Sequence, residues 1–567
     1  MKNRIKPILV GPHHTIREVM TVIKDAPHAK PEPAPSGIAV VVDKNGRLLG
    51  IATDGDIRRA ILKNISIDEK VSQIMRKDPI TVRSSIPMTD MIREIIDRVK
   101  NRNIVDKKIE KVVIVDDEDK ISDVVSFFDL WRSSEVQTRN ICVVGLGYVG
   151  LTLALTLADV GFDVAGVDMN KKIIASLKAS KPHFHEVGLE PLLKYHTGKN
   201  FNAFSDLKHA QSDVYIIAVN TPVDKKGKVI MDYLRGALTE VSKVLKPHDL
   251  VILRSTVPMG TCRNVAAPIL EKGSGLKAGN EFYLAFAPER TIEGKALEEL
   301  RTLPQIIGGI NKTSVDLTAK LFKSITGVIV PVSGLEVAEM VKLLNNTFRD
   351  LSFAYANEVA QICDRFSVNS FEVIGAANNG YPRNKIPTPS PGVGGACLTK
   401  DPYILTESAR KAGFSPKLMV AGRKINDSMI DYVANRVNKF FGGAKNKKIF
   451  VMGVAFKGYP ETSDIRFSTA VDVINKLKDK HNVCVYDAVV SKGALKKNNL
   501  RAVSVKEGFK DADCILVLNN HPSFKELDIY DLLKRMKNPG LFFDGWNMFA
   551  EDTFKNISGV AYATFGK

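Results

Sequence analysis

A glycine-rich segment that follows a short apolar run constrains the fold more than any other feature of the chain. The segment reads Gly145-Leu146-Gly147-Tyr148-Val149-Gly150. Residues 141–144 before it are apolar, as in a strand buried on both faces, and residues 151–160 after it are largely apolar and lack Gly and Pro. A second apolar stretch, residues 164–167, ends in Asp168. This order predicts a strand–helix–strand unit that binds a dinucleotide, with the pyrophosphate at the helix N-terminus and the ribose on the acidic residue.

The residues around this unit specify the cofactor further. Asp168 favours NAD over NADP, because a carboxylate repels a 2′-phosphate, although Lys171 and Lys172 weaken this preference. Two later apolar runs, residues 214–219 and 250–253, also end in polar loops, as strands of an open parallel sheet do beside a ligand. The alternative is an accidental glycine-rich turn. We predict NAD contacts from Gly145, Gly147, Tyr148, Val149, Gly150, Asp168, Thr221, Ser255 and Thr256.

Length and composition bound the class of protein. At 567 residues the chain is too long for one core, and about three or four domains are expected. No apolar run is long enough to cross a membrane and the basic start lacks an apolar signal core, so we expect a cytoplasmic protein. The net charge of +18 fits either a nucleic-acid surface or attraction of anionic substrates; because lysines are spread along the whole chain, we expect no nucleic acid. The cysteines form no C-x-x-C pair, which predicts a reducing compartment and no metal site.

A weak internal repeat marks residues 1–132 as a separate module. The copies, residues 37–57 and 111–130, each read as a strand, an acidic turn, a second strand and a helix opened by a hydroxyl and an Asp. Chance rarely aligns two hydrophobic patterns and a polar pair. The matching polar residues are Thr53 with Ser126 and Asp56 with Asp129.

These copies resemble a pair of CBS motifs, tandem modules that typically bind adenine nucleotides in a cleft between the repeats. The resemblance implies a ribose site made by Thr53, Asp56, Ser126 and Asp129. The second copy has Asp123 in place of the glycine of the first, so we expect that one of the two clefts can be empty. The alternative is that Asp54 and Asp56 only cap a helix.

The remainder of the chain divides into further parts. A polar linker, residues 132–140, precedes a dinucleotide domain expected over residues 139–330. Residues 331–440 include an apolar pattern at helical spacing from about 334 to 372, which predicts one long helix, or two joined, and the spine of a homodimer or a higher homo-oligomer. A further α/β unit is expected over residues 445–567. We therefore predict an α/β protein with two Rossmann-like, doubly wound domains joined by a long central helix, preceded by an α/β module.

A thiol stands in the glycine-rich segment of residues 392–401, which reads GVGGACLTKD. The glycines let the backbone turn tightly and approach a ligand, and Asp401 follows Cys397 by one helical turn if a helix starts there. The alternative is a small buried cysteine without a chemical role. Beside a dinucleotide site, a thiol permits two successive oxidations of a primary alcohol, through an aldehyde, a thiohemiacetal and a thioester that water releases as an acid.

Two polar residues on the expected long helix are candidates to stabilise oxyanions. Lys342 and Asn346 lie four positions apart and therefore share a face of the helix. The alternative is a solvated surface pair. If Lys342 lies near Cys397, we expect it to lower the pKa of the thiol.

Seven segments within residues 139–567 resemble motifs of the UDP-glucose/GDP-mannose dehydrogenase family. Enzymes of this family oxidise the C6 hydroxyl of nucleotide sugars to a carboxylate. They are residues 145–150, 255–261, 287–290, 339–346, 392–401, 456–457 and 463–466. The resemblance implies Cys397 as nucleophile, Lys342 and Asn346 as oxyanion stabilisers, Asp401 and Thr256 as residues that position or activate water, and Glu289 as an aid to thioester hydrolysis. Arg383 falls where the family sends an arginine to the substrate, often across a dimer interface. The implied nucleotide-sugar contacts are Glu289, Arg290, Lys342, Asn346, Arg383, Gly394, Lys457 and Arg466.

The identity of the sugar is left open by the sequence. The Pro288-Glu289-Arg290 segment resembles the branch that acts on UDP-N-acetylhexosamines, with UDP-N-acetylmannosamine and UDP-N-acetylglucosamine as leading substrates. Ala396 and residues 398–400 depart from that branch, which keeps UDP-glucose and GDP-mannose as alternatives. Two other classes remain: a one-step alcohol dehydrogenase that does not need the thiol, and a catalytically inactive nucleotide-binding regulatory protein.

Overall fold

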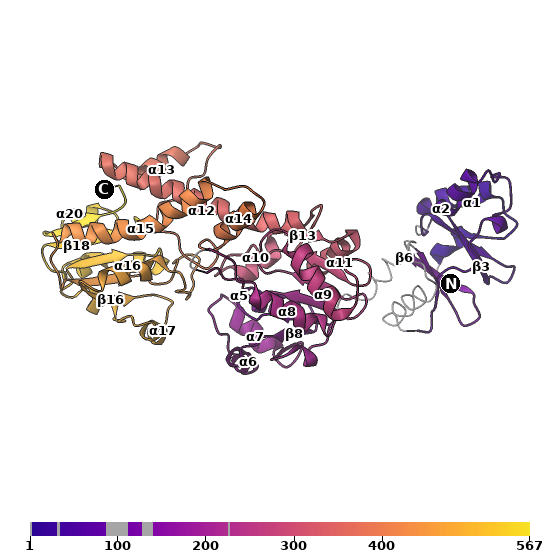
Figure 1. Cartoon of the computed structure of the whole chain (residues 1–567), viewed down its shortest axis with the longest axis horizontal. Coiled ribbons are helices and arrows are strands. Elements are labelled where there is room, and N and C mark those ends of the chain that lie inside the picture. The colour runs from indigo at the N-terminus through magenta and orange to yellow at the C-terminus, as the bar shows by residue number, and fades with distance from the viewer. Residues whose placement is uncertain (1–2, 31–33, 87–110, 127–139, 225–226, 567) are drawn as a thin grey trace. The chain divides into compact units, whose positions relative to one another are not determined.

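The computed structural model describes residues 3–30, 34–86, 111–126, 140–224 and 227–566. The chain separates into two compact units, Met1–Thr138 and Arg139–Lys567. Figure 1 shows the elements of each unit along the chain. No helix in the described ranges is long and apolar enough to cross a membrane.

The N-terminal unit contains two three-stranded sheets with the same internal plan. In each sheet the first strand is parallel to the second, which pairs antiparallel with the third. The register shifts after Val41 in one sheet and after Ile114 in the other, which are matching positions of the repeat. The predicted repeat is therefore present in the backbone as well as in the sequence. The elements are η1 Asn3–Ile8, β1 Leu9–Val10, α1 Ile16–Asp25, η2 Ala26–His28, β2 Ile38–Val42, β3 Leu48–Thr53, α2 Asp54–Leu62, η3 Val71–Gln73, β4 Thr81–Arg83, β5 Lys111–Val115 and β6 Ile121–Ser126.

The second unit begins with an eight-stranded sheet in the order β14-β13-β12-β11-β10-β7-β8-β9. All neighbours are parallel except β12 and β13. Its strands are β7 Ile141–Val144, β8 Val164–Val167, β9 Phe201–Phe204, β10 Val214–Ile217, β11 Leu250–Leu253, β12 Tyr283–Phe286, β13 Gln305–Gly309 and β14 Ile329–Pro331. Its helices are α5 Tyr148–Asp159, α6 Lys171–Lys178, α7 Leu189–His196, η5 Leu207–His209, α8 Asp232–Ser242, η6 Cys262–Ala266, α9 Ala267–Ser274, α10 Ala296–Thr302 and α11 Lys312–Lys323.

Long helices follow this sheet and lead to the second one (Figure 1). The 32-residue helix α12 Leu335–Phe366 ends at Ser367, whose φ of 55° lies in the left-handed region and breaks the helical path. A separate helix, α13 Ser370–Asn378, then begins, so the pattern predicted over residues 334–372 is two joined helices. Helices α14 Asp401–Lys411 and α15 Leu418–Phe440 complete this region, and both pack on α12.

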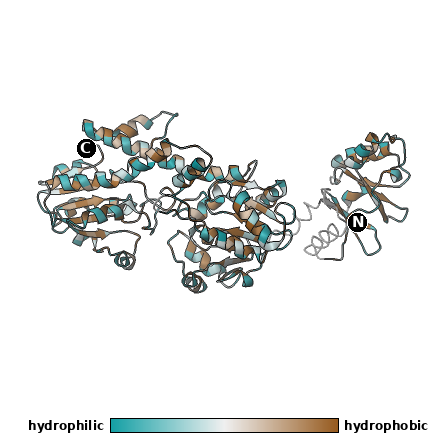
Figure 2. Cartoon of the chain, viewed as in Figure 1, coloured by the Kyte–Doolittle hydropathy of each residue, from teal (hydrophilic) through white to brown (hydrophobic). Residues whose placement is uncertain are grey.

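The last part of the chain forms a five-stranded parallel sheet in the order β16-β15-β17-β18-β19. In both large sheets the central strands are buried on both faces, and Figure 2 shows them as apolar ribbons among amphipathic helices. The predicted fold class, two Rossmann-like sheets joined by a long helix, is confirmed. The elements are β15 Lys448–Met452, α16 Thr469–Leu477, β16 Asn482–Tyr486, α17 Lys492–Lys497, α18 Val505–Phe509, β17 Cys514–Val517, η7 Pro522–Glu526, α19 Ile529–Leu533, β18 Gly540–Asp544, α20 Asp552–Lys555 and β19 Val560–Ala563.

Candidate active site

The glycine-rich turn after β7 has the geometry that a dinucleotide needs. Gly145 adopts φ 93°, and a Cβ there would lie 2.8 Å from the Ala218 carbonyl oxygen. A Cβ on Gly150 would lie 1.8 Å from the Gly145 carbonyl, so that position excludes any side chain. A Cβ on Gly147, by contrast, would meet no described atom within 4 Å. The open space beside Gly147, at the start of α5, fits a pyrophosphate that approaches the backbone.

Asp168 stands at the end of β8, where it can hold a ribose. Its Oδ2 accepts a hydrogen bond from the Leu146 amide at 2.9 Å, and its Oδ1 accepts one from the Asn170 amide at 2.8 Å. The residue is half-buried, and each carboxylate oxygen keeps lone-pair capacity for a sugar hydroxyl. The donor set therefore fits NAD.

Tyr148 and Val149 of the glycine-rich turn differ in what they contact. The Tyr148 hydroxyl bonds to the Glu186 carboxylate, which also accepts the amides of Gly294 and Ala296 at 2.7 and 2.8 Å. Tyr148 thus ties the turn to a neighbouring loop through its hydroxyl. Val149 is half-buried in the first turn of α5.

The predicted cofactor residues of the loops after β10 and β11 are bonded to one another. The Thr221 hydroxyl donates to the Thr256 carbonyl, and the Ser255 hydroxyl donates to the Val219 carbonyl at 2.7 Å. Lys400, which sequence reasoning did not select, reaches this place from the thiol loop, with its Nζ 3.4 Å from the Thr221 Oγ1. In the sequence, only its place next to Asp401 could have pointed to Lys400, because it belongs to no periodic pattern and no motif spacing.

The thiol loop turns where its glycines allow it. Gly395 has φ 88°, and its amide donates to the Phe467 carbonyl at 3.0 Å. A Cβ on Gly394 would lie 2.5 Å from the same oxygen, so glycine is required for this approach. The Asp401 amide donates to the Cys397 carbonyl at 2.9 Å, and α14 begins at Asp401. The thiol and the carboxylate are therefore one helical turn apart.

A buried amide–carboxylate pair lies beside the thiol loop. The Asn346 Nδ2 donates to the Asp401 Oδ2 at 2.6 Å, which joins α12 to the start of α14. The Asp401 Oδ1 is buried and has no hydrogen-bond partner among the described residues. Its nearest cation is the Lys400 Nζ at 3.9 Å. One carboxylate oxygen is therefore held in place while the other can accept a proton from a water or a hydroxyl.

The charges around Cys397 do not lower the pKa of its thiol. Cys397 is exposed, yet desolvation by the surrounding protein disfavours the thiolate and raises the pKa of the thiol. The negative charge of Asp401 adds to this effect. The buried Lys342 acts in the opposite direction but does not outweigh them. The expectation of a lowered thiol pKa was therefore wrong, because desolvation and a neighbouring carboxylate exceed the effect of one ammonium group.

Glu289 is an ion-paired carboxylate rather than a free base. Its Oε2 accepts two hydrogen bonds from the buried Arg254 guanidinium, and its Oε1 accepts the amides of Arg290 and Thr291 at 2.7 and 2.8 Å. Burial raises the pKa of Glu289, but Arg254, the Thr291 amide and Lys342 outweigh burial and hold it below its usual value. Glu289 therefore presents a fixed negative charge near Lys342. Arg254, at the end of β11, was missed because its motif resembles an ordinary polar loop.

A second charged group lies between the two sheets. The Lys457 ammonium donates to the Glu293 carbonyl, and burial lowers the pKa of Lys457 to about 8. Burial also raises the pKa of the Glu293 carboxyl, as does Asp464. Arg466 forms an ion pair with Asp464, and both Asp464 and Cys397 raise the pKa of its guanidinium. Glu293 was not selected from the sequence, since its environment depends on residues more than 160 positions away.

The guanidinium groups of two predicted substrate residues, Arg290 and Arg383, bond to partners outside the predicted site. The Arg290 guanidinium donates to the Pro304 carbonyl, and burial lowers the pKa of Arg290. Arg383 is exposed on the loop after α13, where its Nε donates to the Tyr381 hydroxyl at 2.9 Å. Its described contacts do not include the other predicted site residues, so this chain alone does not bring Arg383 to the thiol.

The N-terminal unit uses Thr53 and Asp56 to cap α2. The Thr53 hydroxyl donates to the Asp56 Oδ2 at 2.6 Å, and each side chain also accepts the other residue's amide. Arg59 and Arg76 pair with the same Asp56 carboxylate. The Ser126 side chain and Asp129 lie outside the described residues, so the predicted four-residue ribose site is described only in its first half.

The Gly50 position shows how the two repeats differ. A Cβ on Gly50 would lie 2.6 Å from the Arg76 carbonyl, so the backbone of Arg76 occupies that space. The matching Asp123 is buried and accepts three hydrogen bonds of 3.0 to 3.1 Å from the Arg4 guanidinium. The space at this position is thus filled by the Arg76 main chain in the first repeat, and the matching Asp123 of the second repeat forms an ion pair with Arg4.

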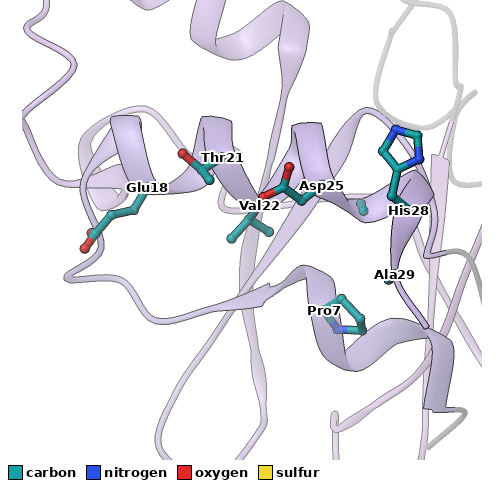
Figure 3. Close-up of a pocket in the computed structure, with 8 residues that line it drawn as sticks. Pro7, Glu18, Thr21, Val22, Asp25, His28 and Ala29 are labelled. Atoms are coloured by element: carbon teal, nitrogen blue, oxygen red, sulfur yellow. The ribbon is translucent and has the colours of Figure 1, made fainter. Parts of the chain in front are cut away.

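A cavity of about 510 Å³ in this unit lies beside α1 (Figure 3). Thr53 and Asp56 do not line it. Its lining residues are Pro7, Glu18, Thr21, Val22, Asp25, Ala26, His28 and Ala29.

Family profiles match most of the second unit in chain order. The NAD binding domain, the central domain and the UDP binding domain of the UDP-glucose/GDP-mannose dehydrogenase family match residues 139–326, 336–428 and 450–551. The chain belongs to this family. It is an NAD-dependent nucleotide sugar dehydrogenase, and the predicted family and cofactor are confirmed. The CBS domain profile matches residues 3–63 and 71–130, which confirms the CBS pair.

Relatives with assigned names are similar over the second unit. UDP-N-acetyl-D-mannosamine dehydrogenase of Methanococcus maripaludis is 34% identical over 435 residues, which cover 75% of this chain and 96% of the relative. The corresponding enzyme of Pyrococcus horikoshii is 36% identical over 423 residues, or 73% of this chain and 96% of that one. A solved structure of the Pyrococcus horikoshii enzyme superposes with a TM-score of 0.68 at 33% identity, covering 75% and 99% of the two chains.

A UDP-glucose dehydrogenase structure from Pyrobaculum islandicum also gives a TM-score of 0.68, at 25% identity, covering 76% and 98% of the two chains. Fold similarity alone therefore does not choose between sugars.

Proposed function

We propose that the chain oxidises the C6 hydroxyl of a UDP-N-acetylhexosamine to the uronic acid, a four-electron reaction that uses two NAD and a covalent bond to Cys397. The observation that carries the proposal is the Asn346–Asp401 pair one helical turn from an exposed thiol. UDP-N-acetyl-D-mannosamine is the preferred substrate, because the two relatives described above are dehydrogenases of that sugar nucleotide and the Pro288-Glu289-Arg290 segment fits the same branch.

The residues divide the chemistry between them. The glycine-rich turn and Asp168 would hold NAD, which would supply the hydride acceptor for each oxidation. After the first oxidation the Cys397 sulfur bonds to the aldehyde carbon as the C=O π bond breaks, and the thiol proton passes by way of a base to the former carbonyl oxygen, giving a thiohemiacetal. The second oxidation converts this species to a thioester, which water cleaves to the carboxylate while the thiol is restored.

Asp401 is the base that the geometry favours. Its Oδ2 is fixed by Asn346, and its Oδ1 is left to take a proton from the thiol or from water. In this proposal the Lys342 ammonium stabilises negative charge on the thiolate and the oxyanions, which is supported by its electrostatic effect on both Cys397 and Glu289. Thr256 helps position water in this proposal, and Glu289 acts through its charge rather than by accepting a proton.

The test is the stoichiometry of NADH formed per sugar across a panel of UDP- and GDP-sugars. We expect two NADH per UDP-N-acetylhexosamine for the native chain, and no acid from Cys397→Ser. Cys363→Ser, which changes a buried cysteine of α12, is the matched control and should keep full turnover. One NADH per sugar with aldehyde as product, or a serine variant that makes the acid at the native rate, would exclude the covalent route.

A second proposal concerns the CBS pair, which we infer binds an adenine nucleotide that modulates the dehydrogenase. The support is the CBS profile match together with Thr53 and Asp56 at the start of α2, where anions and ribose hydroxyls are favoured. Because Arg4 neutralises Asp123 in the second repeat, we expect one nucleotide per module. Binding changes catalysis only if the ligand favours one arrangement of the two units.

Titration of AMP, ADP and ATP into the full chain, followed by steady-state kinetics, tests this proposal. Asp56→Ala should remove nucleotide binding and leave basal oxidation unchanged, whereas Asp68→Ala, at an exposed ion pair with Arg17, should change neither. Absence of binding by all three nucleotides refutes the nucleotide site. Binding without any change in turnover or substrate affinity refutes the regulatory role.

We also propose a homodimer through α12. The helix carries a row of exposed apolar side chains, an arrangement that favours a partner surface. A second copy satisfies the apolar face, and Arg383 then contacts the nucleotide sugar of that copy. Phe348→Asp should yield a monomer in light scattering, and a native chain that is monomeric at micromolar concentration would contradict the proposal. The row comprises Val337, Leu344, Phe348, Tyr355, Ile362 and Phe366.

A further inference from the structure

One carboxylate lies between two imidazoles where the two large sheets meet. The Glu461 Oε1 is 2.8 Å from the His185 Nε2, and the Glu461 Oε2 is 3.6 Å from the His521 Nε2. His185 lies in the first Rossmann-like domain, between α6 and α7, and His521 lies in the second, after β17. Glu461 itself lies in the loop between β15 and α16. It therefore joins the two Rossmann-like domains through a single side chain.

The hydrogen bonds of His521 fix where its proton lies. The Ser523 amide donates to the His521 Nδ1 at 3.2 Å, so in the neutral ring Nδ1 is an acceptor and Nε2 carries the hydrogen. That Nε2 is buried and has no hydrogen-bond partner elsewhere in the described chain. The Glu461 Oε2 lies 3.6 Å from this nitrogen, so a shortening of that separation would allow a hydrogen bond.

The same loop is tied down on either side of Glu461. The amides of Gly458 and Tyr459 donate to the Asn520 Oδ1 at 3.0 and 3.1 Å. The Thr462 hydroxyl donates to the Glu293 Oε2 at 3.1 Å, across the boundary between the domains. These bonds bracket Glu461 between one anchor in each domain.

The backbone of Glu461 marks a close approach of the two domains. A Cβ on Gly294, which has φ 90°, would lie 2.4 Å from the Glu461 carbonyl oxygen. The neighbouring Glu293 carbonyl accepts the Lys457 ammonium. A movement of the loop at Glu461 would therefore move Lys457 and the residues up to Arg466 relative to the first domain.

We infer that Glu461 is a positioning residue, whose carboxylate holds the loop of residues 457–466 against the first domain through its hydrogen bond to His185 and its place 3.6 Å from the His521 Nε2. The inference rests on the proposed function, because it assigns to this loop the placement of Lys457 and Arg466 at the proposed substrate site of Cys397. Glu461 acts through these residues and does not itself take part in the chemistry. The sequence alone does not single out Glu461, because its partners His185 and His521 lie 276 and 60 positions away.

The expected size of the effect follows from exposure. The side chains of His185 and Glu461 are 39% and 40% exposed, so solvent weakens their attraction, and the clamp biases the loop rather than locking it. Loss of an interaction that positions binding residues equally in the ground state and the transition state raises KM and leaves kcat unchanged. We expect Glu461→Ala to raise KM for the nucleotide sugar by about five- to tenfold with kcat within about twofold.

The experiment measures KM, kcat and the Kd for UDP on the full chain. The variants are Glu461→Ala, Glu461→Gln, Glu461→Asp and His185→Ala, with Glu190→Gln as the matched control because Glu190 pairs with Lys194 on the surface of α7. We expect the increase in KM to fall in the order Ala, Gln, Asp, with Asp restoring part of the native value. Glu190→Gln should behave as the native chain does.

The double variant Glu461→Ala/His185→Ala separates a clamp from general loosening. If the two side chains act together, the double variant has nearly the KM of Glu461→Ala alone. Additive increases in KM, an unchanged KM in Glu461→Ala, or a loss of kcat at native KM would each overturn the inference. The Kd for UDP is measured without turnover, so it tests the clamp even if the proposed covalent oxidation fails.

Discussion

The two Rossmann-like domains begin alike and are used differently. In each, the first strand ends in a glycine with positive φ, 93° at Gly145 and 90° at Gly453, and the second strand is followed by an aspartate. In each, that aspartate accepts a backbone amide next to the glycine, 2.9 Å from Leu146 to Asp168 and 2.7 Å from Val454 to Asp487. The same local frame therefore stands at the start of both sheets.

The domains differ in the segment that connects this glycine to the next helix. In the first domain α5 begins at Tyr148 and presents its N-terminus to the cofactor. In the second domain α16 begins only at Thr469, and the long intervening loop carries Lys457, Glu461 and Arg466 towards the first domain. A short turn thus makes a dinucleotide site, while a long loop makes a contact between domains.

The aspartates differ as well. Asp168 is half-buried and accepts two amides, which leaves room for a ribose. Asp487 is buried and accepts four amides, from Val454, Ala455, Val489 and Val490. A carboxylate that is fully used by the backbone supports the loop and cannot also hold a cofactor. The function of each aspartate therefore follows from its remaining hydrogen-bonding capacity and not from its position in the motif.

Asp487→Ala should have the largest effect on stability, since it leaves buried amides without an acceptor. Each such donor costs about 1–3 kcal/mol, so we expect the second domain to lose more than about 3 kcal/mol. The change is measured by guanidinium unfolding followed through Trp546 fluorescence in a Trp131→Phe background. Asp168→Ala is the paired variant, and we expect it to lose less than about 1 kcal/mol. Equal losses would show that the two aspartates have the same role.

Gly147→Ala should separate cofactor binding from folding. Because a Cβ at this position meets no described atom within 4 Å, the unfolding midpoint should stay at the native value. NAD affinity should fall by about 10- to 100-fold, since the methyl group occupies the approach of the pyrophosphate. Calorimetric titration of NAD measures this loss, and Gly236→Ala in α8, which also has open space, is the control. Native NAD affinity in Gly147→Ala would place the pyrophosphate elsewhere.

Lys457 should make UDP binding depend on pH in the second domain. Burial lowers the pKa of Lys457 to about 8, so its positive charge is present below that pH and is lost as the pH rises through it. Between pH 7 and 9 the Kd for UDP should therefore increase, by up to about tenfold. Lys457→Arg keeps its charge and should flatten the profile. A native profile that is already flat would mean that this ammonium does not bind the nucleotide.

Asp168→Ala should have the smallest effect of these variants. It should change the preference for NAD over NADP and leave turnover with NAD nearly unchanged. Removal of the carboxylate abolishes its repulsion of a 2′-phosphate, so NADP should be used more nearly as well as NAD. The ratio of kcat/KM for the two cofactors measures this, and we expect it to fall by about tenfold. Equal use of NAD and NADP by the native chain would contradict the role of Asp168 at the ribose.

Local signals in the sequence were sufficient for the frame of the molecule. The glycine-rich turn, the apolar strands and the repeat of residues 37–57 and 111–130 predicted the Rossmann-like sheets, NAD and the CBS pair, all of which are confirmed. Such features depend on residues close together in the chain, where glycine conformation and hydrophobic periodicity act directly. The apolar pattern over residues 334–372 predicts one helix or two joined helices, and Ser367, with its left-handed backbone, divides the segment into two.

The tertiary structure alone decided the chemistry of the charged residues. Glu289 looked available in the sequence, but Arg254 and two amides engage both of its oxygens. The thiol pKa of Cys397 is raised because desolvation and Asp401 outweigh Lys342, and the contacts of Glu293 and Glu461 join segments far apart in the chain. Sequence spacing fixes which groups are near one another along a helix or strand. Desolvation and cross-domain neighbours, which set charge and hydrogen-bonding capacity, exist only once the sheets and α12 have packed.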